Sequence, residues 1–217
     1  MKVAVVLYDA VEPIDLAVVG VLSMAKRVTD QLEYFTVAQG GGATTLQNGL
    51  TVQVDYAFET APAADAVIVT GGPGWQRQTK DAAMLDFLRR RAVAGEVIGS
   101  VCTGAMILAA AGLLDGKRAT TKSEVVPPEH SPMAALRNRF GIDSKAALVV
   151  DEGLVFTGGG VTLGIDTTLY LLQRFLGEQV AQETARIMEY QAAWEANRKR
   201  LPTLVANSSH EEAIDRL

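Results

Sequence analysis

Short runs of β-branched and other apolar residues are the feature that most constrains the fold of this chain. Three of them are KVAVVLY (2–8), DAVIVTGG (65–72) and EVIGSV (96–101). Polar and apolar residues do not alternate in these runs, as they would in a strand with one solvent-exposed face. Each run therefore predicts a strand buried on both faces, as in a parallel sheet. Stretches with apolar residues at helical spacing lie between them. The sequence therefore predicts one α/β domain with a mainly parallel sheet.

The other segments complete this pattern. Further strands are predicted at 33–39, in a hairpin over 44–56 around Asn48-Gly49, and as a pair within 145–160. Helices are predicted from Pro13 to about Val28 and over 81–93, 103–116, 133–141, 162–177 and 178–200. We expect the domain to cover 1–195, followed by a C-terminal extension over 196–217 that forms either a docked helix or a tail.

Charge and cysteine content narrow the class of protein. The net charge is −5, and the short basic clusters at 89–91 and 198–200 fit solvated helix faces better than a nucleic-acid site. No apolar stretch reaches the length of a membrane span, and the N-terminus does not resemble a signal peptide. One cysteine excludes an intramolecular disulfide. We therefore expect a cytoplasmic protein that acts on a small molecule.

The single cysteine lies in GSVCTGA (99–105), between a predicted strand and a predicted helix. A strand, a sharp turn and a helix with small neighbours form a nucleophile elbow, which lifts Cys102 above the sheet edge where ligands of α/β proteins bind. At a helix N-terminus the thiol pKa is expected to fall below about 8.5. The alternative is a buried cysteine with a purely structural role, and position alone leaves the two evenly balanced.

Two further segments offer groups that could assist the thiol. The N–H of Gly72, in VTGGPG (69–74), and that of Thr103 could form an oxyanion hole, although a plain tight turn explains the glycines equally well. Asp15 could be a general acid or base, or could simply stabilise the start of its helix. The two histidines are far apart in sequence, so neither a metal site nor a Cys-His dyad is indicated.

GSVCTGAMILAAAGLLDGKRATT (99–121), together with VTGGPG and FTGGGVTLGID (156–166), resembles the ThiJ/PfpI superfamily, and within it the isonitrile hydratases. The resemblance implies a flavodoxin-like three-layer α/β sandwich, usually a homodimer, with Cys102 as nucleophile, Asp15 and Thr103 beside it, and Gly72 in the oxyanion hole. It implies hydration of an isonitrile to an N-substituted formamide by a lyase that needs no metal or other cofactor.

The chain departs from the hydratase pattern at two places. Val18 and Val19 stand where the family has Gly-Pro, which changes the first helix and the predicted pocket wall. Lys122 and Ser123 stand where the hydratases have histidine and tryptophan, and Lys122 could face solvent or lie near the thiol as a cation. The rival functions are another activity of the superfamily, such as a glyoxalase-like one, and a non-catalytic sensor that uses the cysteine for redox or ligand sensing.

Overall fold

The computed structural model describes residues 1–206, and an eight-stranded sheet forms its centre, in the order β12-β10-β11-β7-β6-β1-β2-β5. The strands are β1 (Lys2–Val6), β2 (Glu33–Ala38), β5 (Tyr56–Ala57), β6 (Ala66–Val69), β7 (Val97–Ser100), β10 (Val149–Asp151), β11 (Val155–Gly158) and β12 (Thr203–Val205). Every neighbouring pair is parallel except β10 and β11. The predicted mainly parallel sheet is confirmed.

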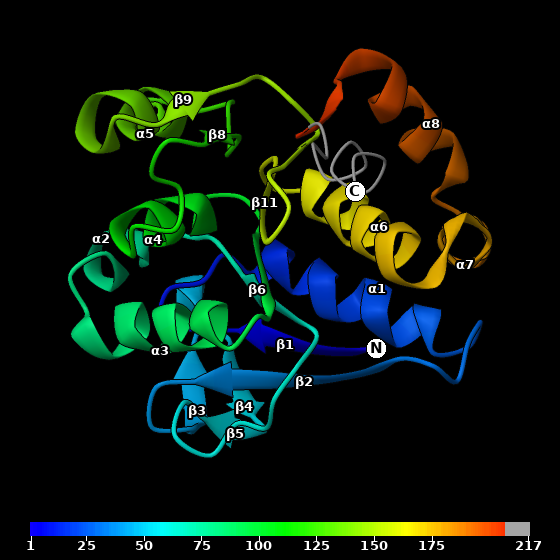
Figure 1. The fold of residues 1–217 in the computed structure, drawn as a ribbon, viewed down its shortest axis with the longest axis horizontal. Coiled ribbons are helices and arrows are strands. Elements are labelled where there is room, and N and C mark those ends of the chain that lie inside the picture. Colours follow the sequence, from blue (N-terminus) through cyan, green and yellow to red (C-terminus); the bar gives the residue numbers. More distant parts are fainter. Residues whose placement is uncertain (207–217) are drawn as a thin grey trace, which may run out of the picture.

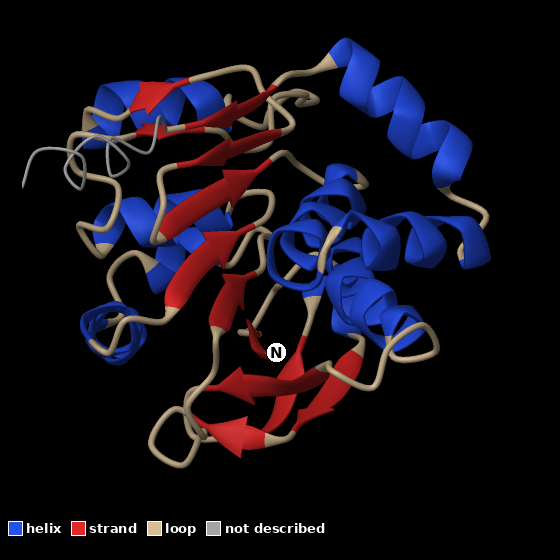
Figure 2. Cartoon of the chain, turned by 45° about the vertical axis from the view of Figure 1, so that its right-hand side comes forward, coloured by secondary structure: helices blue, strands red, loops and turns tan. Residues whose placement is uncertain are grey.

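Helices cover both faces of this sheet (Figures 1 and 2). One layer holds α1 (Ala17–Ala25), α6 (Leu163–Leu176) and α7 (Glu178–Ile187), with α8 (Gln191–Arg200) packed against α7. The other holds α2 (Trp75–Gln78), α3 (Ala82–Val93), α4 (Gly104–Ala110) and α5 (Pro132–Phe140). The predicted three-layer α/β sandwich is therefore confirmed.

The central strands explain the apolar runs. In β1 the residues from Val3 to Val6 are fully buried, and all four residues of β6 are fully buried as well. Helices pack on both faces of these strands, so no position faces water and the alternation of a half-exposed strand is absent. Burying each valine or isoleucine side chain among them contributes about 1.5–3 kcal/mol. The same packing fixes the strand ends from which the site residues project.

Three predicted helices differ from the structure. The helix predicted over 103–116 is shorter, because α4 ends at Ala110 and the chain turns at Gly112, which has a left-handed φ of 77°. The segment 178–200 forms α7 and α8 rather than one helix, because Glu189 is left-handed (φ 55°) and the Tyr190 N–H bonds to the Ala185 carbonyl at 2.9 Å, which closes a helix end. The helix predicted to begin at Pro13 begins as a 3₁₀ turn, η1 (Pro13–Leu16), before α1. Proline in this first turn needs no backbone partner for its missing N–H.

The minor strands and the C-terminal segment complete the sheet edges. The predicted hairpin is confirmed as β3 (Gly42–Thr45) paired with β4 (Thr51–Val54) around the 3₁₀ turn η2 (Gln47–Gly49), and β8 (Arg118–Ala119) pairs with β9 (Asp143–Ser144). After Pro202 the chain forms β12, parallel to β10, so residues 203–205 are neither a helix nor a tail. Residues 207–217 of the predicted extension lie outside the described residues, and its boundary stays a prediction.

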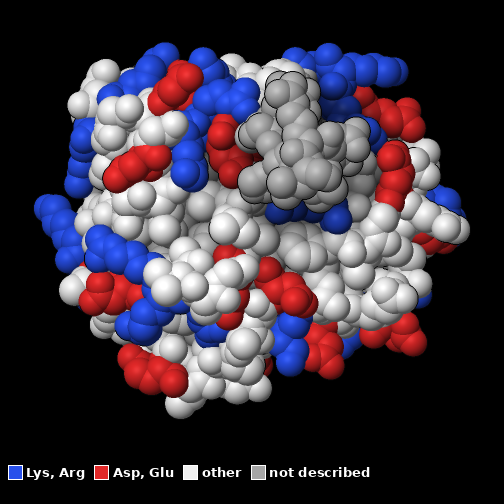
Figure 3. Space-filling model, viewed as in Figure 1, with Lys and Arg blue, Asp and Glu red and all other residues white. Residues whose placement is uncertain are grey.

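The described surface carries both signs of charge. On the face shown in Figure 3, the Lys and Arg side chains are interspersed with Asp and Glu side chains rather than gathered in one field. The basic residues of 198–200 lie in the last turn of α8, where cations complement the helix dipole. Within residues 1–206, the helices are all too short or too polar to cross a membrane.

Candidate active site around Cys102

Cys102 lies directly after β7 and before α4, at the carboxyl edge of the sheet, and has the backbone of a nucleophile elbow. Its φ is 52°, a left-handed conformation that costs a non-glycine residue about 1–2 kcal/mol. The turn is held on both sides, because the Cys102 N–H donates to the Gly159 carbonyl at 3.0 Å and the Thr121 hydroxyl donates to the Cys102 carbonyl at 2.7 Å. The thiol residue is 3% exposed.

The small residues beside the elbow are required by close backbone contacts. A Cβ at Gly104 would lie 2.4 Å from the Val69 carbonyl oxygen, so α4 packs directly on the end of β6. A Cβ at Gly71 would lie 2.5 Å from the Thr103 nitrogen and 2.7 Å from the Cys102 Cβ. The end of β6 therefore touches the elbow itself, and this contact brings the VTGGPG segment to the thiol.

Asp15 lies in η1 and is only 2% exposed. Its Oδ2 accepts the Gly71 N–H at 2.6 Å, whereas Oδ1 is buried without a well-formed hydrogen bond among the described residues. The thiol of Cys102 approaches this carboxyl closely enough to lower the Asp15 pKa by a hydrogen bond, which partly opposes the effect of burial. The structure thus brings Asp15 and Cys102 together, an arrangement that the residues alone left open and the family resemblance implied.

Burial governs the protonation of this pair. It raises the pKa of Asp15 from 3.8 to about 7, with the nearby Glu12 charge adding to the effect and the Gly71 N–H opposing it. Burial, followed by the Asp15 charge, raises the pKa of Cys102 to about 12. The predicted lowering of the thiol pKa is therefore wrong. At neutral pH the sulfur holds its proton, and Asp15 is close to half ionised.

Thr103 and Gly72 are in contact, but they are not arranged as the predicted oxyanion hole. The Gly72 N–H donates to the Thr103 hydroxyl at 2.8 Å, and this hydroxyl also lies 3.3 Å from the Gly72 carbonyl. The Thr103 N–H is directed at the sulfur of Cys102, whose pKa it lowers. An oxyanion hole that uses the N–H groups of both Gly72 and Thr103 would require the Thr103 side chain to rotate away from Gly72. The oxyanion hole stays a prediction.

Val161 is a site residue that the sequence reasoning missed. Its N–H bonds to the Cys102 sulfur and lowers the thiol pKa, and it adopts φ 58°, which is unusual for a β-branched residue. It follows the glycine triplet of FTGGGV at the end of β11. The triplet was a signal for a tight turn at the carboxyl edge, the same kind of signal that pointed to Gly72.

The elbow opens onto a cavity of about 850 Å³. Its walls include the apolar residues Ile14, Trp75, Val126, Pro127 and Pro128, and its charged lining residues are Glu12, Lys122 and Glu129. Val18 is instead fully buried in the core, and neither it nor Val19 lines this cavity, so the prediction that they form a pocket wall is wrong. Val18 belongs to the core and Val19 packs against it, so neither forms part of the wall of this cavity.

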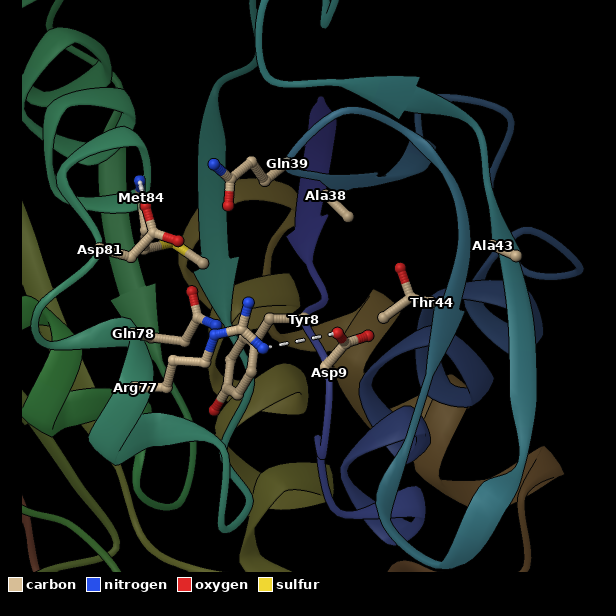
Figure 4. Close-up of a pocket in the computed structure, with 10 residues that line it drawn as sticks. All are labelled: Tyr8, Asp9, Ala38, Gln39, Ala43, Thr44, Arg77, Gln78, Asp81 and Met84. Atoms are coloured by element: carbon tan, nitrogen blue, oxygen red, sulfur yellow. Dashed lines mark hydrogen bonds and ion pairs between the residues drawn. The ribbon is translucent and has the colours of Figure 1, made fainter.

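A second cavity, of about 140 Å³, is lined by Tyr8 and Asp9 after β1 and by Ala38 and Gln39 at the end of β2 (Figure 4). Its lining is polar, with Asp9 and Arg77 as an ion pair across it at 4.0 Å, and it contains no cysteine. The Tyr8 hydroxyl points away to the Thr70 carbonyl at 2.9 Å. Of these two cavities, the larger one is lined by Cys102, and the buried Asp15 lies beside that residue.

The fold agrees with that of known proteins. The profile of the DJ-1/PfpI family matches residues 1–174. This chain belongs to the DJ-1/PfpI family. The resemblance expected from the sequence is thereby confirmed. The crystal structure of a ThiJ/PfpI family protein from Pseudomonas syringae superposes with a TM-score of 0.76 at 27% identity, over 87% of this chain and 74% of that chain.

Two curated relatives show how different the members of this family can be. Isonitrile hydratase from Pseudomonas putida is 39% identical over 149 residues, which cover 69% of this chain and 62% of the hydratase. The HTH-type transcriptional regulator GbdR from Pseudomonas aeruginosa is 32% identical over 191 residues, which cover 85% of this chain and 47% of the regulator. The chain thus spans less than two thirds of the length of either relative.

Proposed function

We propose that the protein is a cysteine-dependent isonitrile hydratase, a lyase that adds water to R–N≡C and releases an N-substituted formamide without a cofactor. The observation that carries the proposal is the buried Cys102–Asp15 pair at an elbow that opens onto a cavity with apolar walls. The similarity to isonitrile hydratase supports it. An isonitrile is small, uncharged and electrophilic at its terminal carbon, which suits both the walls and the thiol.

The first step joins the sulfur to the terminal carbon. As the S–C bond forms, the thiol proton moves to the Asp15 carboxylate, which then gives it to the same carbon to yield a thioimidate, R–N=CH–S–Cys102. The transfer is easier than the thiol pKa of about 12 suggests. Part of that rise comes from the Asp15 charge, and the charge disappears once Asp15 holds the proton.

The second step consumes water. Water adds to the thioimidate carbon, the C–S bond breaks, the sulfur regains a proton through Asp15, and R–NH–CHO leaves. A carboxyl whose pKa lies at about 7 can accept and return a proton at neutral pH with little cost in either direction. The N–H groups of Val161 and Thr103 stabilise negative charge on the sulfur during both proton transfers.

The test is formamide production from cyclohexyl isocyanide by the purified full chain. Cys102→Ala should abolish turnover, and Asp15→Asn should reduce it by at least about a hundredfold, the usual contribution of a general acid–base group. Asp86→Asn, on the exposed side of α3, should leave turnover unchanged. Turnover by the wild-type protein no faster than by Cys102→Ala would refute the proposal.

A ligand sensor without catalysis is the second candidate, because the regulator GbdR is similar over 85% of this chain. The redox version of a sensor is disfavoured by the burial of Cys102 and by its raised pKa, since peroxide attacks the exposed thiolate. A ligand sensor would bind an isonitrile or formamide equally well in the wild type and in Cys102→Ala, with no turnover in either. The homodimer implied by the family resemblance is part of the proposal, and light scattering tests it.

A further inference from the structure

Lys122 and Glu129 form an ion pair inside the cavity that Cys102 opens onto. The Lys122 ammonium contacts both carboxyl oxygens of Glu129, and both residues line the cavity. The lysine side chain is 19% exposed and the glutamate 38%. The pair is therefore partly shielded from water, so its field acts on the cavity more strongly than that of a fully solvated pair would.

The position of the lysine is fixed from two sides. Lys122 follows Thr121, whose hydroxyl bonds to the Cys102 carbonyl, so its backbone is tied to the elbow. Gly160 packs against its stem, and a Cβ there would lie 2.5 Å from the Lys122 Cβ. The stem has no room to move away from the cavity on that side. The lysine charge thus lies close to the sulfur, and it lowers the pKa of Cys102.

Three of the residues that line the cavity are charged. Among the lining residues within 1–206, Glu12 and Glu129 are acidic and Lys122 is basic, which gives a formal charge of −2 + 1 = −1. Because Glu129 contacts the ammonium directly, it cancels the only positive charge of this lining, and Glu12 supplies the remainder. A ligand anion would have to displace Glu129 before it could pair with Lys122.

We propose that the Lys122–Glu129 pair sets the charge selectivity of the Cys102 cavity, so that uncharged substrates are accepted and anionic ones disfavoured. Lys122 is the specificity-determining residue, and Glu129 is a positioning residue that neutralises it. The identification of the uncharged substrate as an isonitrile rests on the proposed function. The selectivity itself rests on the charges of the cavity lining, and the partly ionised Asp15 beside the sulfur is the same in every variant compared.

The decisive measurement compares alkylation of Cys102 by neutral iodoacetamide and anionic iodoacetate at pH 8. In both reagents the sulfur displaces iodide from a methylene carbon, and Cys102 is the single cysteine, so the adduct mass reports one site. The ratio of the iodoacetate rate to the iodoacetamide rate measures the field at the sulfur. Glu129→Gln should raise this ratio, and Lys122→Met should lower it, each by about three- to tenfold.

Two more variants separate charge from loop structure. The double variant Lys122→Met/Glu129→Gln restores the formal charge of −1 and should return the ratio to near the wild-type value. Glu124→Gln removes a charge from an exposed position of the same loop that does not line the cavity, and should change nothing. If the pair only anchored the loop, both single variants and the double variant would shift the ratio in one direction, and that result overturns the inference.

A second assay compares turnover of the neutral cyclohexyl isocyanide with turnover of the anionic isocyanoacetate. Glu129→Gln should raise kcat/KM for isocyanoacetate relative to cyclohexyl isocyanide by a similar three- to tenfold factor, about the value expected for one nearby charge. If neither isonitrile is turned over, the proposed function fails, yet the alkylation ratios still decide the charge selectivity. If isonitriles are turned over and the alkylation ratios of the two single variants equal that of the wild type, the selectivity inference fails alone.

Discussion

Replacing Asp15 by asparagine should make the protein more stable at alkaline pH, although it should destroy the activity. The carboxyl is 2% exposed, and burial raises its pKa from 3.8 to about 7. The folded state therefore holds this proton more tightly than the unfolded state does. Stability is lost as the pH rises from about 4 to about 7, and stays low above that.

The size of the effect follows from the two pKa values. The difference between 3.8 and about 7 corresponds to about 4 kcal/mol in the free energy of unfolding, of which about 2 kcal/mol falls between pH 5 and pH 7 and about 3 kcal/mol between pH 5 and pH 8. Asparagine cannot ionise, and its carbonyl can still accept the Gly71 N–H that now bonds to Oδ2 at 2.6 Å. The thiol of Cys102 contributes little below pH 8, because its ordinary value of 9.0 lies above that range.

Urea unfolding at pH 5 and pH 8 measures the effect in both proteins. Between pH 5 and pH 8 we expect the free energy of unfolding of Asp15→Asn to fall by about 3 kcal/mol less than that of the wild type. The variant should be the more stable protein at pH 8. Asp30→Asn removes an exposed carboxyl and should follow the wild-type curve. Wild type and Asp15→Asn with parallel pH dependence would show that the carboxyl is not held protonated by burial, and the proton-transfer step would lose its basis.

Four further predictions concern the pH profile of the site, two of its contacts and one exposed position on α1. The kcat/KM for cyclohexyl isocyanide should rise with pH through about 7, because the reactive pair holds one proton and Asp15 must be ionised to accept it; a flat profile between pH 5 and 8 would contradict this. Thr103→Val should cost about 1–3 kcal/mol in urea unfolding, since it leaves the Gly72 N–H without its 2.8 Å partner, whereas Thr103→Ser keeps it. Gly71→Ala should destabilise the protein and slow Cys102 alkylation, because its Cβ would lie 2.5 Å from the Thr103 nitrogen. Gly20→Ala on α1 meets nothing within 4 Å and should add about 0.5–1 kcal/mol of stability.

The amino-acid sequence predicted the buried strands and the hairpin, because the residues within each of these segments determine its conformation. The unalternating runs of β1, β6 and β7 reflect burial on both faces, and Asn48-Gly49 marked the hairpin because both residues need the positive φ that they have in the structure. The break between α7 and α8 could not be predicted in this way. It is stabilised by Tyr190, which donates to Asp166 at 2.8 Å across 24 residues of sequence, and no neighbouring glycine or proline marks it.

The site residues also divide into those that local sequence features indicate and those that depend on contacts between distant segments. Cys102 and Asp15 could be found because an elbow and an acid in a first turn are local features, and the family resemblance connected them. The sequence left open whether Lys122 faces solvent or the site. Its partner Glu129 lies in a proline-rich loop, and the sequence does not specify the path of that loop. The contact between Thr103 and Gly72 depends on a side-chain rotamer that brings two distant segments together, and spacing carries no information about it.

The thiol pKa shows how magnitudes decide between two opposing effects. A helix N-terminus stabilises a nearby anion by about 0.3–1 kcal/mol, which is less than one pKa unit, and α4 has only seven residues. Burial can raise a pKa by about 3–5 units, so burial prevails at a site that is 3% exposed. In the proposed mechanism Cys102 becomes nucleophilic when its proton and its electron pair move together, the proton to Asp15 and the pair to an electrophile. We expect such a site to react slowly with peroxide at rest. It favours an uncharged electrophile that takes up the transferred proton, which is how an isonitrile carbon reacts.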